Sequence, residues 1–296
     1  MPTDRELPTP DGEPAEVPEF TIAHLSDTHL TPIGIRYNGR IDADAALASV
    51  AEQLRIAAGN GYRFDAVVAS GDLTDTGDPD AYRRLRAALE PLGVPLIFAT
   101  GNHDVRTVFH RELLGIDAAH PLVQQVWLDD RLRVVVLDST IVGAGHGRLT
   151  AETLAELDGI LGTAAPAGTI VVLHHAPIPP PSPALVYFAL ERASRRALAE
   201  VVGGRDVRLI LAGHHHIAQS GVLSGVPVAV AGSTAIRTDP LAPHFHEHTT
   251  ESRAFNLVRI YPDTVTTTVV PVDGAAEVFN LVPEQLTALI TAHPTT

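Results

Sequence analysis

Residues 20–29 read FTIAHLSDTH, a stretch in which a strand-like segment runs directly into polar residues. The segment Phe20–Leu25 is a short, mostly apolar run of the kind that forms a buried strand. Asp27 and His29 follow its carboxyl end, which is where α/β folds place their ligand-binding crevices. The stretch therefore predicts an α/β fold in which this strand ends at a binding site.

The same pattern recurs four more times along the chain. Strand-like runs at 66–69, 95–99, 169–173 and 207–211 are each followed by Asp, Asn or His. The polar residues concerned are Asp72, Asn102, His103, Asp104, His174, His175, His214, His215 and His216. A single polar residue after a strand is commonly a turn former. Five strand ends that all carry oxygen or imidazole donors indicate one shared site instead.

Three glycines, Gly71, Gly101 and Gly213, each precede one of these polar residues. We expect them where the backbone has to turn sharply to direct the side chain that follows.

Helix-like stretches alternate with several of these strands. They are expected at 42–58, 80–89, 151–161 and 189–201, and Asp42 and Asp78–Pro79 suit helix starts. Further strands are expected at 133–137, 222–223, 227–231, 255–261 and 264–271, with a closing helix at 283–291. The alternation predicts an α/β arrangement in which helices flank sheets.

The chain has no internal repeat and no linker in its middle, so we expect one folded domain over residues 20–296. Residues 1–19 contain five Pro and six acidic residues and little apolar material. Such a composition predicts a disordered tail.

Composition excludes several classes of protein. The formal charge is −14, and all 21 basic residues are Arg, which argues against a surface that grips nucleic acid or anionic lipid. The absence of Cys excludes disulfides, thiolate metal sites and a Cys nucleophile. No apolar run approaches the roughly 18–20 residues of a membrane span, and the N-terminus does not resemble a signal peptide. A cytoplasmic protein without membrane insertion is expected.

The donor types at the five strand ends indicate metal binding. Carboxylate and amide oxygens mixed with imidazoles, with no sulfur, suit Mn, Fe or Zn. There are more donors than one ion can use, so we expect two ions. The donor types do not choose between the three metals; our expectation is Fe, Mn or both, with Zn as the alternative.

In chain order, these residues resemble the five motifs of the calcineurin-like metallophosphoesterases. The matching motifs are Asp27-x-His29, Gly71-Asp72, Gly101-Asn102-His103-Asp104, His174 and Gly213-His214-x-His216. The resemblance implies a four-layer αββα sandwich with a dimetal site at the carboxyl ends of its strands. The longer stretches HLSDTHL, GDLTDTGDPDAYRRLR, LHHAPIP, ILAGHHH and YPDTVTTTVVP are similar to class III cyclic nucleotide phosphodiesterases, especially the actinobacterial branch.

The resemblance also implies which residues bind each ion. Asp27, His29 and His216 would hold the first ion, and Asn102, His174 and His214 would hold the second. Asp72 would bridge the two, with one carboxylate oxygen for each. His175 and His215 are not expected to bind metal, and the choice of His174 over His175 rests on the family pattern.

The implied reaction is attack of a metal-bridging hydroxide on a phosphodiester. His103 is the candidate general acid for the leaving oxygen, a role worth roughly 10²–10⁴-fold in rate. Asp104 would orient His103 or support the ligands, unless it only caps a helix that starts near Val105. Asn102, His103 and His146 are the expected substrate contacts, and a solvated loop position is the alternative for His146.

Three further segments of the sequence have an expected role. The run from His244 to His248 contains three His, and we expect a mobile surface loop there rather than a further metal site. The proline-rich segment 177–183 is expected to form a wall of the site. Tyr37, Asn38 and Arg40 lie in the loop after His29, and their spacing does not require contact with a substrate.

The function predicted is hydrolysis of 3′,5′-cyclic nucleotides, cAMP first, to 5′-monophosphates. One alternative is a broader phosphodiesterase for 2′,3′-cyclic nucleotides or glycerophosphodiesters. Another is a non-catalytic scaffold that keeps the fold, although all seven ligand positions are filled. A nuclease is disfavoured because the 21 Arg residues are scattered. The resemblance makes a homodimer the expected assembly.

Overall fold

The structure is a computed structural model that describes residues 15–272, 274 and 276–292. The expected tail therefore lies largely outside the described residues, at 1–14. Residues 15–18 have no regular secondary structure, and the backbone N–H of Glu19 donates to the carbonyl of Ile260 at 2.7 Å.

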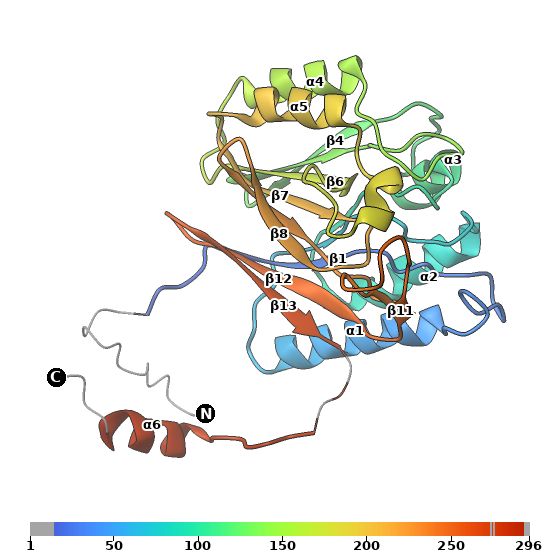
Figure 1. The fold of residues 1–296 in the computed structure, drawn as a ribbon. Coiled ribbons are helices and arrows are strands. Elements are labelled where there is room, and N and C mark those ends of the chain that lie inside the picture. The colour runs from blue at the N-terminus through green and yellow to red at the C-terminus, as the bar shows by residue number, and fades with distance from the viewer. Residues whose placement is uncertain (1–14, 273, 275, 293–296) are drawn as a thin grey trace.

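Two β-sheets form the centre of the molecule (Figure 1). The first has the order β13-β12-β1-β2-β3, in which β1, β2 and β3 are parallel while β12 and β13 are antiparallel. Its strands are β1 (Phe20–Leu25), β2 (Ala66–Ala69), β3 (Leu96–Phe98), β12 (Ala254–Ile260) and β13 (Val265–Pro271).

The second sheet has the order β4-β5-β6-β7-β9-β8, with a parallel centre from β5 to β9. The strands β4 and β8 run antiparallel at its two edges. Its strands are β4 (Val123–Leu128), β5 (Leu132–Leu137), β6 (Thr169–His175), β7 (Val207–Gly213), β8 (Gln219–Leu223) and β9 (Val226–Val230).

Helices cover the outer face of each sheet, as Figure 1 shows. The helices α1 (Ala43–Gly59) and α2 (Pro79–Leu89) lie on the first sheet, and α4 (Ala151–Leu161) and α5 (Arg192–Val202) lie on the second. Asp42 and Asp78 start α1 and α2 as predicted, because their carboxylates accept from Ala45 N and Ala81 N.

Alternation along the strands divides the core into three layers. In β1, Phe20 and Ile22 point between the two sheets, whereas Ala23 and Leu25 pack under α1 and α2. A third apolar layer lies between the second sheet and helices α4 and α5. These layers confirm the predicted four-layer αββα sandwich.

Some elements differ from the sequence prediction. The edge strand β4 was not predicted, since its sequence VQQVWL carries two Gln and lacks a continuous apolar run. Two short strands, β10 (Arg237–Thr238) and β11 (Thr249–Thr250), were also missed. The helix considered near Val105 is present as the short helix α3 (Arg106–Phe109). The helix expected from 189 begins at Arg192 and is preceded by a 3₁₀ segment, Pro183–Phe188. The closing helix α6 spans Pro283–Ala292.

Nowhere in the described residues is there a helix with both the length and the apolar character needed to cross a bilayer.

Candidate metal centre

The backbone adopts the left-handed conformation at five of the predicted ligands. The φ angles are +54° at Asp27, +44° at His29, +49° at Asp72, +82° at His214 and +55° at His216. Such values are uncommon for residues other than Gly and cost of order 1–3 kcal/mol each. Their concentration at the strand ends indicates a site whose geometry is maintained at the expense of local stability.

Two of the three glycines named above are required by close packing rather than by a turn. Gly71 has φ +105°, and a Cβ there would also lie 2.4 Å from His174 Nδ1. Gly101 and Gly213 lack a positive φ, but a Cβ would lie 2.0 Å from Asp72 N and 1.8 Å from Ser26 Oγ, respectively. The expectation of a sharp turn is therefore right for Gly71 only, and the other two allow neighbouring strand ends to approach.

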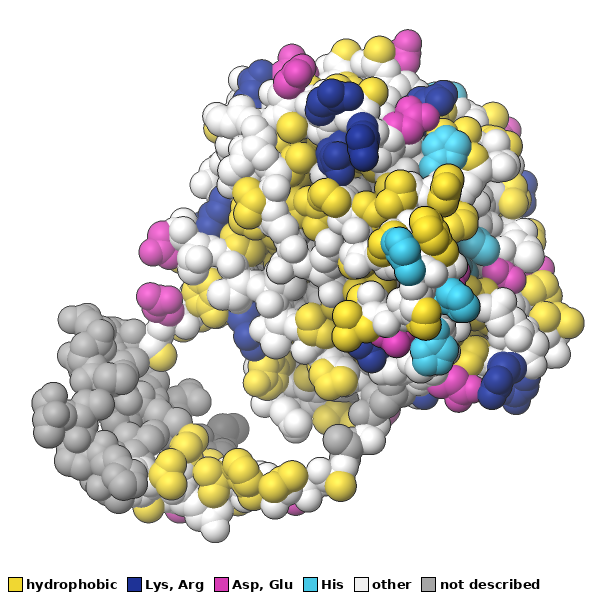
Figure 2. Space-filling view, viewed as in Figure 1, with side chains coloured by type: hydrophobic (Ala, Val, Ile, Leu, Met, Phe, Trp, Pro, Cys, Tyr) yellow, Lys and Arg dark blue, Asp and Glu magenta, His cyan; other side chains and the backbone are white. Residues whose placement is uncertain are grey.

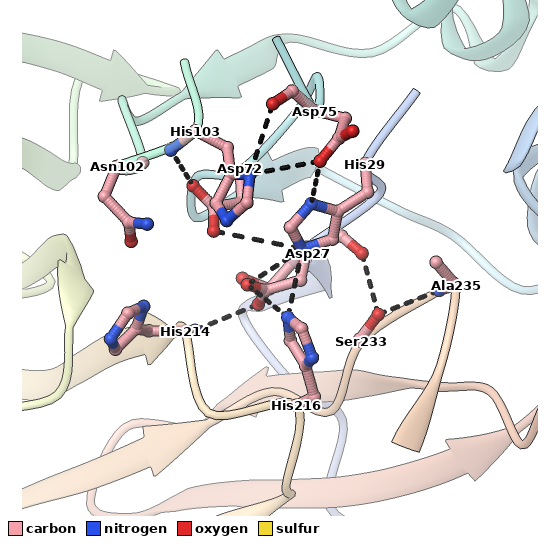
Figure 3. A network of polar contacts seen from close by, with 12 residues as sticks. Asp27, His29, Asp72, Asp75, Asn102, His103, His214, His216, Ser233 and Ala235 are labelled. Carbon is pink, nitrogen blue, oxygen red and sulfur yellow. Dashed lines mark hydrogen bonds and ion pairs between the residues drawn. The ribbon is translucent and has the colours of Figure 1, made fainter. Parts of the chain in front are cut away.

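Asp27, His29 and His216 form one group of converging donors (Figure 3). His29 Nε2 lies 3.0 Å from His216 Nε2, and His216 Nε2 lies 3.3 Å from Asp27 Oδ1. The three come from the ends of β1 and β7, on different sheets.

Asn102, His174 and His214 form a second group. His174 Nε2 lies 3.2 Å from Asn102 Oδ1 and 3.2 Å from His214 Nδ1. These residues follow β3, end β6 and follow β7, so this group also joins both sheets.

Asp72 stands between the two groups. Its Oδ2 lies 3.3 Å from His174 Nε2 and 3.9 Å from His29 Nε2. Its Oδ1 accepts a hydrogen bond of 2.8 Å from the backbone N–H of His103. One oxygen, Oδ2, therefore faces both groups, which differs from the expectation of one oxygen for each ion.

The outer nitrogens of two His rings are held by backbone carbonyls. His174 Nδ1 donates to Ser70 O at 2.8 Å, and His214 Nε2 donates to Phe188 O at 2.8 Å. Each bond fixes the tautomer and leaves the other ring nitrogen as a lone-pair donor toward the centre. The ring of Tyr37 stacks on that of His29 at 4.4 Å.

The donors fit metal ions. Asp27 Oδ1 is buried and has no hydrogen-bond partner among the described residues, and buried carboxylate oxygens need compensation. Around His174 Nε2, the atoms Asp72 Oδ2, Asn102 Oδ1 and His214 Nδ1 offer lone pairs that converge on a cation-sized region. Oxygen and imidazole donors in this mixture suit Mn, Fe and Zn.

Neighbouring charges at the centre shift the pKa values of its carboxyl and imidazole groups. Burial raises the pKa of Asp27, but the nearby ring of His216 outweighs it and lowers that pKa to about 2. Burial opposes protonation of His174, yet the carboxylate of Asp72 raises the pKa of that ring to about 9. A proton and a cation therefore compete for the same nitrogen of His174.

His103 lies at the mouth of the centre, with 40% of its side chain exposed. Its Nδ1 lies 3.1 Å from Asp75 Oδ1, and this hydrogen bond raises the pKa of His103 to about 9. Asp75 was not assigned from the sequence. It stands three residues after Asp72 in the same loop, so the spacing Asp-x-x-Asp was the available signal.

Asp104 holds two loops together. Its carboxylate accepts from the backbone of Gly101, Leu73 and Thr74 and from the hydroxyl of Tyr82. Burial and the charge of Asp72 raise the pKa of Asp104 to about 6. The contact to the His103 ring, expected from Asp104, comes from Asp75, and the residue at the N-terminal cap of α3 is Val105.

The neighbours of the expected ligands point elsewhere. His175 bonds through Nδ1 to Ser139 Oγ at 2.9 Å and through Nε2 to Gly145 O at 3.3 Å. His215 is buried, and neither of its ring nitrogens has a hydrogen-bond partner among the described residues.

A pocket of about 300 Å³ opens over the centre. Asp72, Asn102, His103, His214 and His216 form its polar part. The remaining lining residues are Tyr37, Gly145, Leu185, Phe188, His215, Thr238 and Glu247.

His146 lies outside this pocket. Its Nε2 lies 3.6 Å from Glu191 Oε1, and it lines a neighbouring cavity together with Pro179–Pro183. The proline-rich segment thus forms a wall of the neighbouring cavity and not of the pocket over the metal centre. The 3₁₀ segment that follows it contributes Leu185 and Phe188 to that pocket. His244, His246 and His248 are exposed on the loop between β10 and β11, and Glu247 of that loop lines the pocket.

Comparison with known proteins identifies the family of this chain. The family model described as calcineurin-like phosphoesterase matches residues 20–218. The chain belongs to this family. It is 40% identical over 266 residues to a cAMP/cGMP dual specificity phosphodiesterase of Mycobacterium tuberculosis, covering 88% of this chain and 82% of the relative.

A second relative and a solved structure are also similar to this chain. A glycerophosphodiester phosphodiesterase of Enterobacter lignolyticus is 35% identical over 202 residues, which is 66% of this chain and 70% of the relative. Among solved structures, a purple acid phosphatase from yellow lupin seeds has a TM-score of 0.66 at 13% identity, covering 90% of this chain and 54% of that one. The latter supports the fold alone.

Proposed function

We propose that this chain is a phosphodiesterase that hydrolyses 3′,5′-cyclic nucleotides, cAMP first, to 5′-monophosphates. The observation that carries the proposal is the position of Asp72 Oδ2, 3.3 Å from His174 Nε2 and 3.9 Å from His29 Nε2, where two donor groups meet on one oxygen. Similarity to the mycobacterial phosphodiesterase supports the choice of substrate.

Seven residues would hold two metal ions. Asp27, His29 and His216 would bind one ion, Asn102, His174 and His214 the other, and Asp72 Oδ2 both. When bound, the ions supply Lewis-acid polarisation of the phosphate and a water of lowered pKa. Iron and manganese are the ions we favour, with zinc as the alternative.

The protein's own residues would handle the leaving group. Breaking the bond between phosphorus and the 3′-oxygen leaves an alkoxide that requires a proton. His103 stands at the pocket with Nδ1 bound to Asp75, so its Nε2 is free to donate that proton. Asn102 lies beside it and would contact the phosphate, and Asp104 would keep both loops in place.

Apolar groups in the same pocket suit the remainder of a nucleotide. Tyr37, Leu185 and Phe188 offer ring and aliphatic surface beside the polar centre. Such surface can receive a sugar and a base without a charged partner.

A second candidate substrate is a glycerophosphodiester. The enterobacterial relative, 35% identical over 202 residues, bears that activity in its name. The metal donors would serve both reactions, so the difference lies in the apolar wall.

A substrate panel tests the proposal. Protein loaded with Mn²⁺ is assayed on 3′,5′-cAMP, 2′,3′-cAMP and glycerophosphoethanolamine, with Asp72→Ala as the inactive control. Highest kcat/KM on 3′,5′-cAMP supports it, whereas preference for the glycerophosphodiester transfers the proposal to the second candidate. Absence of bound metal and of all activity would favour a non-catalytic scaffold.

The expected homodimer and cytoplasmic location stay predictions. Light scattering of the purified chain and fractionation of the producing cells measure them directly.

A further inference from the structure

A second cavity, of about 650 Å³, lies beside the active-site pocket. Its walls come from the proline-rich segment Pro179–Pro183, from the 3₁₀ segment and from the start of α5. Its volume falls in the range of small-molecule sites, roughly 300–1,000 Å³.

Two arginines give this cavity a positive charge. Arg192 and Arg195 of α5 both line it, and within the described residues neither guanidinium has a hydrogen-bond or ion-pair partner. In Figure 2, basic side chains gather over α5 beside a stretch of apolar surface. Unpaired Arg is notable in a chain of formal charge −14, because acidic groups are abundant.

The acidic residue of the cavity is already neutralised. Glu191 accepts from Arg148 at 2.7 Å and 3.0 Å, and His146 Nε2 lies 3.6 Å from the same carboxylate. The charge left for a ligand is that of Arg192 and Arg195. Two guanidinium groups suit a phosphate dianion, which they can bind through paired N–H···O bonds.

Much of the remaining lining is apolar or aromatic. Tyr187 is 76% exposed and Val186 is 54% exposed, and both line the cavity with the prolines. A ring left open to solvent on a proline-lined wall offers a stacking surface for a flat heterocycle.

We propose that this cavity binds a nucleoside 5′-monophosphate, with its phosphate on Arg192 and Arg195 and its base on Tyr187. The choice of ligand rests on the proposed function, because this is the product formed there. A phosphomonoester carries close to two negative charges at neutral pH and a cyclic diester carries one, so the two arginines favour the product over the substrate.

The cavity and the active-site pocket share a wall. Leu185 and Phe188 line the active-site pocket, whereas Val186 and Tyr187, between them in sequence, line the cavity. The carbonyl of Phe188 accepts from His214 Nε2 at 2.8 Å. A product held in the cavity therefore lies one chain segment away from a predicted metal ligand.

Calorimetric titration of 5′-AMP into the metal-loaded full chain tests the inference. Two binding events are expected in the wild type. The double variant Arg192→Ala/Arg195→Ala should lose one event or weaken it at least about tenfold, since two charge-assisted contacts disappear. Arg196 lies on α5 but does not line the cavity, so Arg196→Ala removes one positive charge from the helix and should bind 5′-AMP as the wild type does.

Two further ligands distinguish binding of the phosphate from binding of the base. Adenosine and inorganic phosphate should each bind the cavity more weakly than 5′-AMP, and Tyr187→Ala, an exposed and structurally mild change, should weaken 5′-AMP but not phosphate. A single binding event in the wild type, equal binding by the double variant, or an equal loss in Arg196→Ala would each overturn the inference.

The result is separable from the proposed function. The double variant is expected to keep wild-type turnover of 3′,5′-cAMP at saturating substrate. A chain that binds 5′-AMP in the cavity but does not hydrolyse 3′,5′-cAMP would refute the proposed function and leave the cavity site in place.

Discussion

The Nδ1 atom of His103 lies 3.1 Å from Oδ1 of Asp75, and it also lies 3.2 Å from the carbonyl oxygen of Asp75. One residue thus contacts the outer nitrogen of the ring through both side chain and backbone. This pairing orients a predicted general acid from the loop that also carries Asp72.

Removing this carboxylate should slow the reaction without emptying the metal centre. We expect Asp75→Asn to lower kcat by about 10–100-fold, the usual effect of losing a partner that orients a functional group. Because Asp75 raises the pKa of His103 to about 9, its loss lowers that pKa. A general acid with a lower pKa loses its proton at a lower pH. The alkaline limb of the profile of kcat/KM against pH therefore shifts to lower pH.

A double-mutant cycle identifies the route of this effect. If Asp75 acts through His103, Asp75→Asn should change the rate little in a His103→Ala background. The control Asp117→Asn removes an exposed carboxylate that does not line the active-site pocket, and it should behave as the wild type. Additive losses in the double variant would assign Asp75 to another role, such as support of His29, whose Nδ1 lies 3.8 Å away.

The metal content of two variants distinguishes a metal ligand, Asp72, from the general acid, His103. Asp72→Ala should lose bound metal together with activity, since Oδ2 faces both donor groups. His103→Ala should keep its metal and turn over roughly 10²–10⁴-fold more slowly. Elemental analysis beside initial rates measures both, and a His103 variant as fast as the wild type would refute the acid assignment.

Adjacent histidines offer a matched pair. His174→Ala should lose one equivalent of metal because Nε2 points to Asp72 and Asn102. His175→Ala should keep both equivalents and lose stability of about 1–3 kcal/mol, since Ser139 Oγ loses its buried partner. Equal metal loss in the two variants would contradict this assignment.

Sequence reasoning found the strands that carry the site because each is short, apolar and followed by chemistry-bearing residues. β1 and β2 were predicted with their observed bounds, and β6 and β7 extend two residues further, through His175 and Gly213. The edge strand β4 was missed because one side of it faces solvent and carries Gln.

Contacts between distant loops were beyond sequence reasoning. The pairing of His103 with Asp75 depends on how two loops from β2 and β3 pack, and Asp104 holds those loops through backbone N–H groups that no motif records. His146 was expected at the substrate, yet the same loop places Gly145 in the active-site pocket and His146 in the cavity beside it. A shift of one residue along this loop therefore decides which of the two spaces a residue lines.

Close packing at Gly101 should make it intolerant of a side chain. A Cβ there would lie 2.0 Å from Asp72 N and 2.2 Å from Asp72 Oδ1, so Gly101→Ala must displace the central carboxylate. We expect loss of metal and a lower melting temperature. Gly59→Ala, at the end of α1 with open space around its Cβ, should instead gain roughly 0.5–1 kcal/mol from helix propensity. Thermal melts with metal analysis compare them, and unchanged metal binding in Gly101→Ala would refute the packing argument.

Acid should destabilise the fold through His24, which lies buried in β1 beside Ser70 and Asn256. Burial lowers the pKa of His24 from 6.5 to about 3, so between these values the unfolded chain binds a proton that the folded chain does not. The contribution of His24 to the free energy of unfolding is therefore fully present above pH 6.5. It falls as the pH drops, by about 2 kcal/mol at pH 5.

Replacing the ring tests this contribution directly. His24→Gln should lower the free energy of unfolding at pH 7.5, because it disturbs a packed polar cluster, but should reduce its loss between pH 7.5 and pH 5. His120→Gln, at an exposed position, should leave the pH dependence unchanged. Urea unfolding at both pH values gives the difference in the free energy of unfolding between each variant and the wild type. An identical acid sensitivity in His24→Gln and the wild type would mean that the buried ring is protonated in the fold or that other histidines dominate the acid limb.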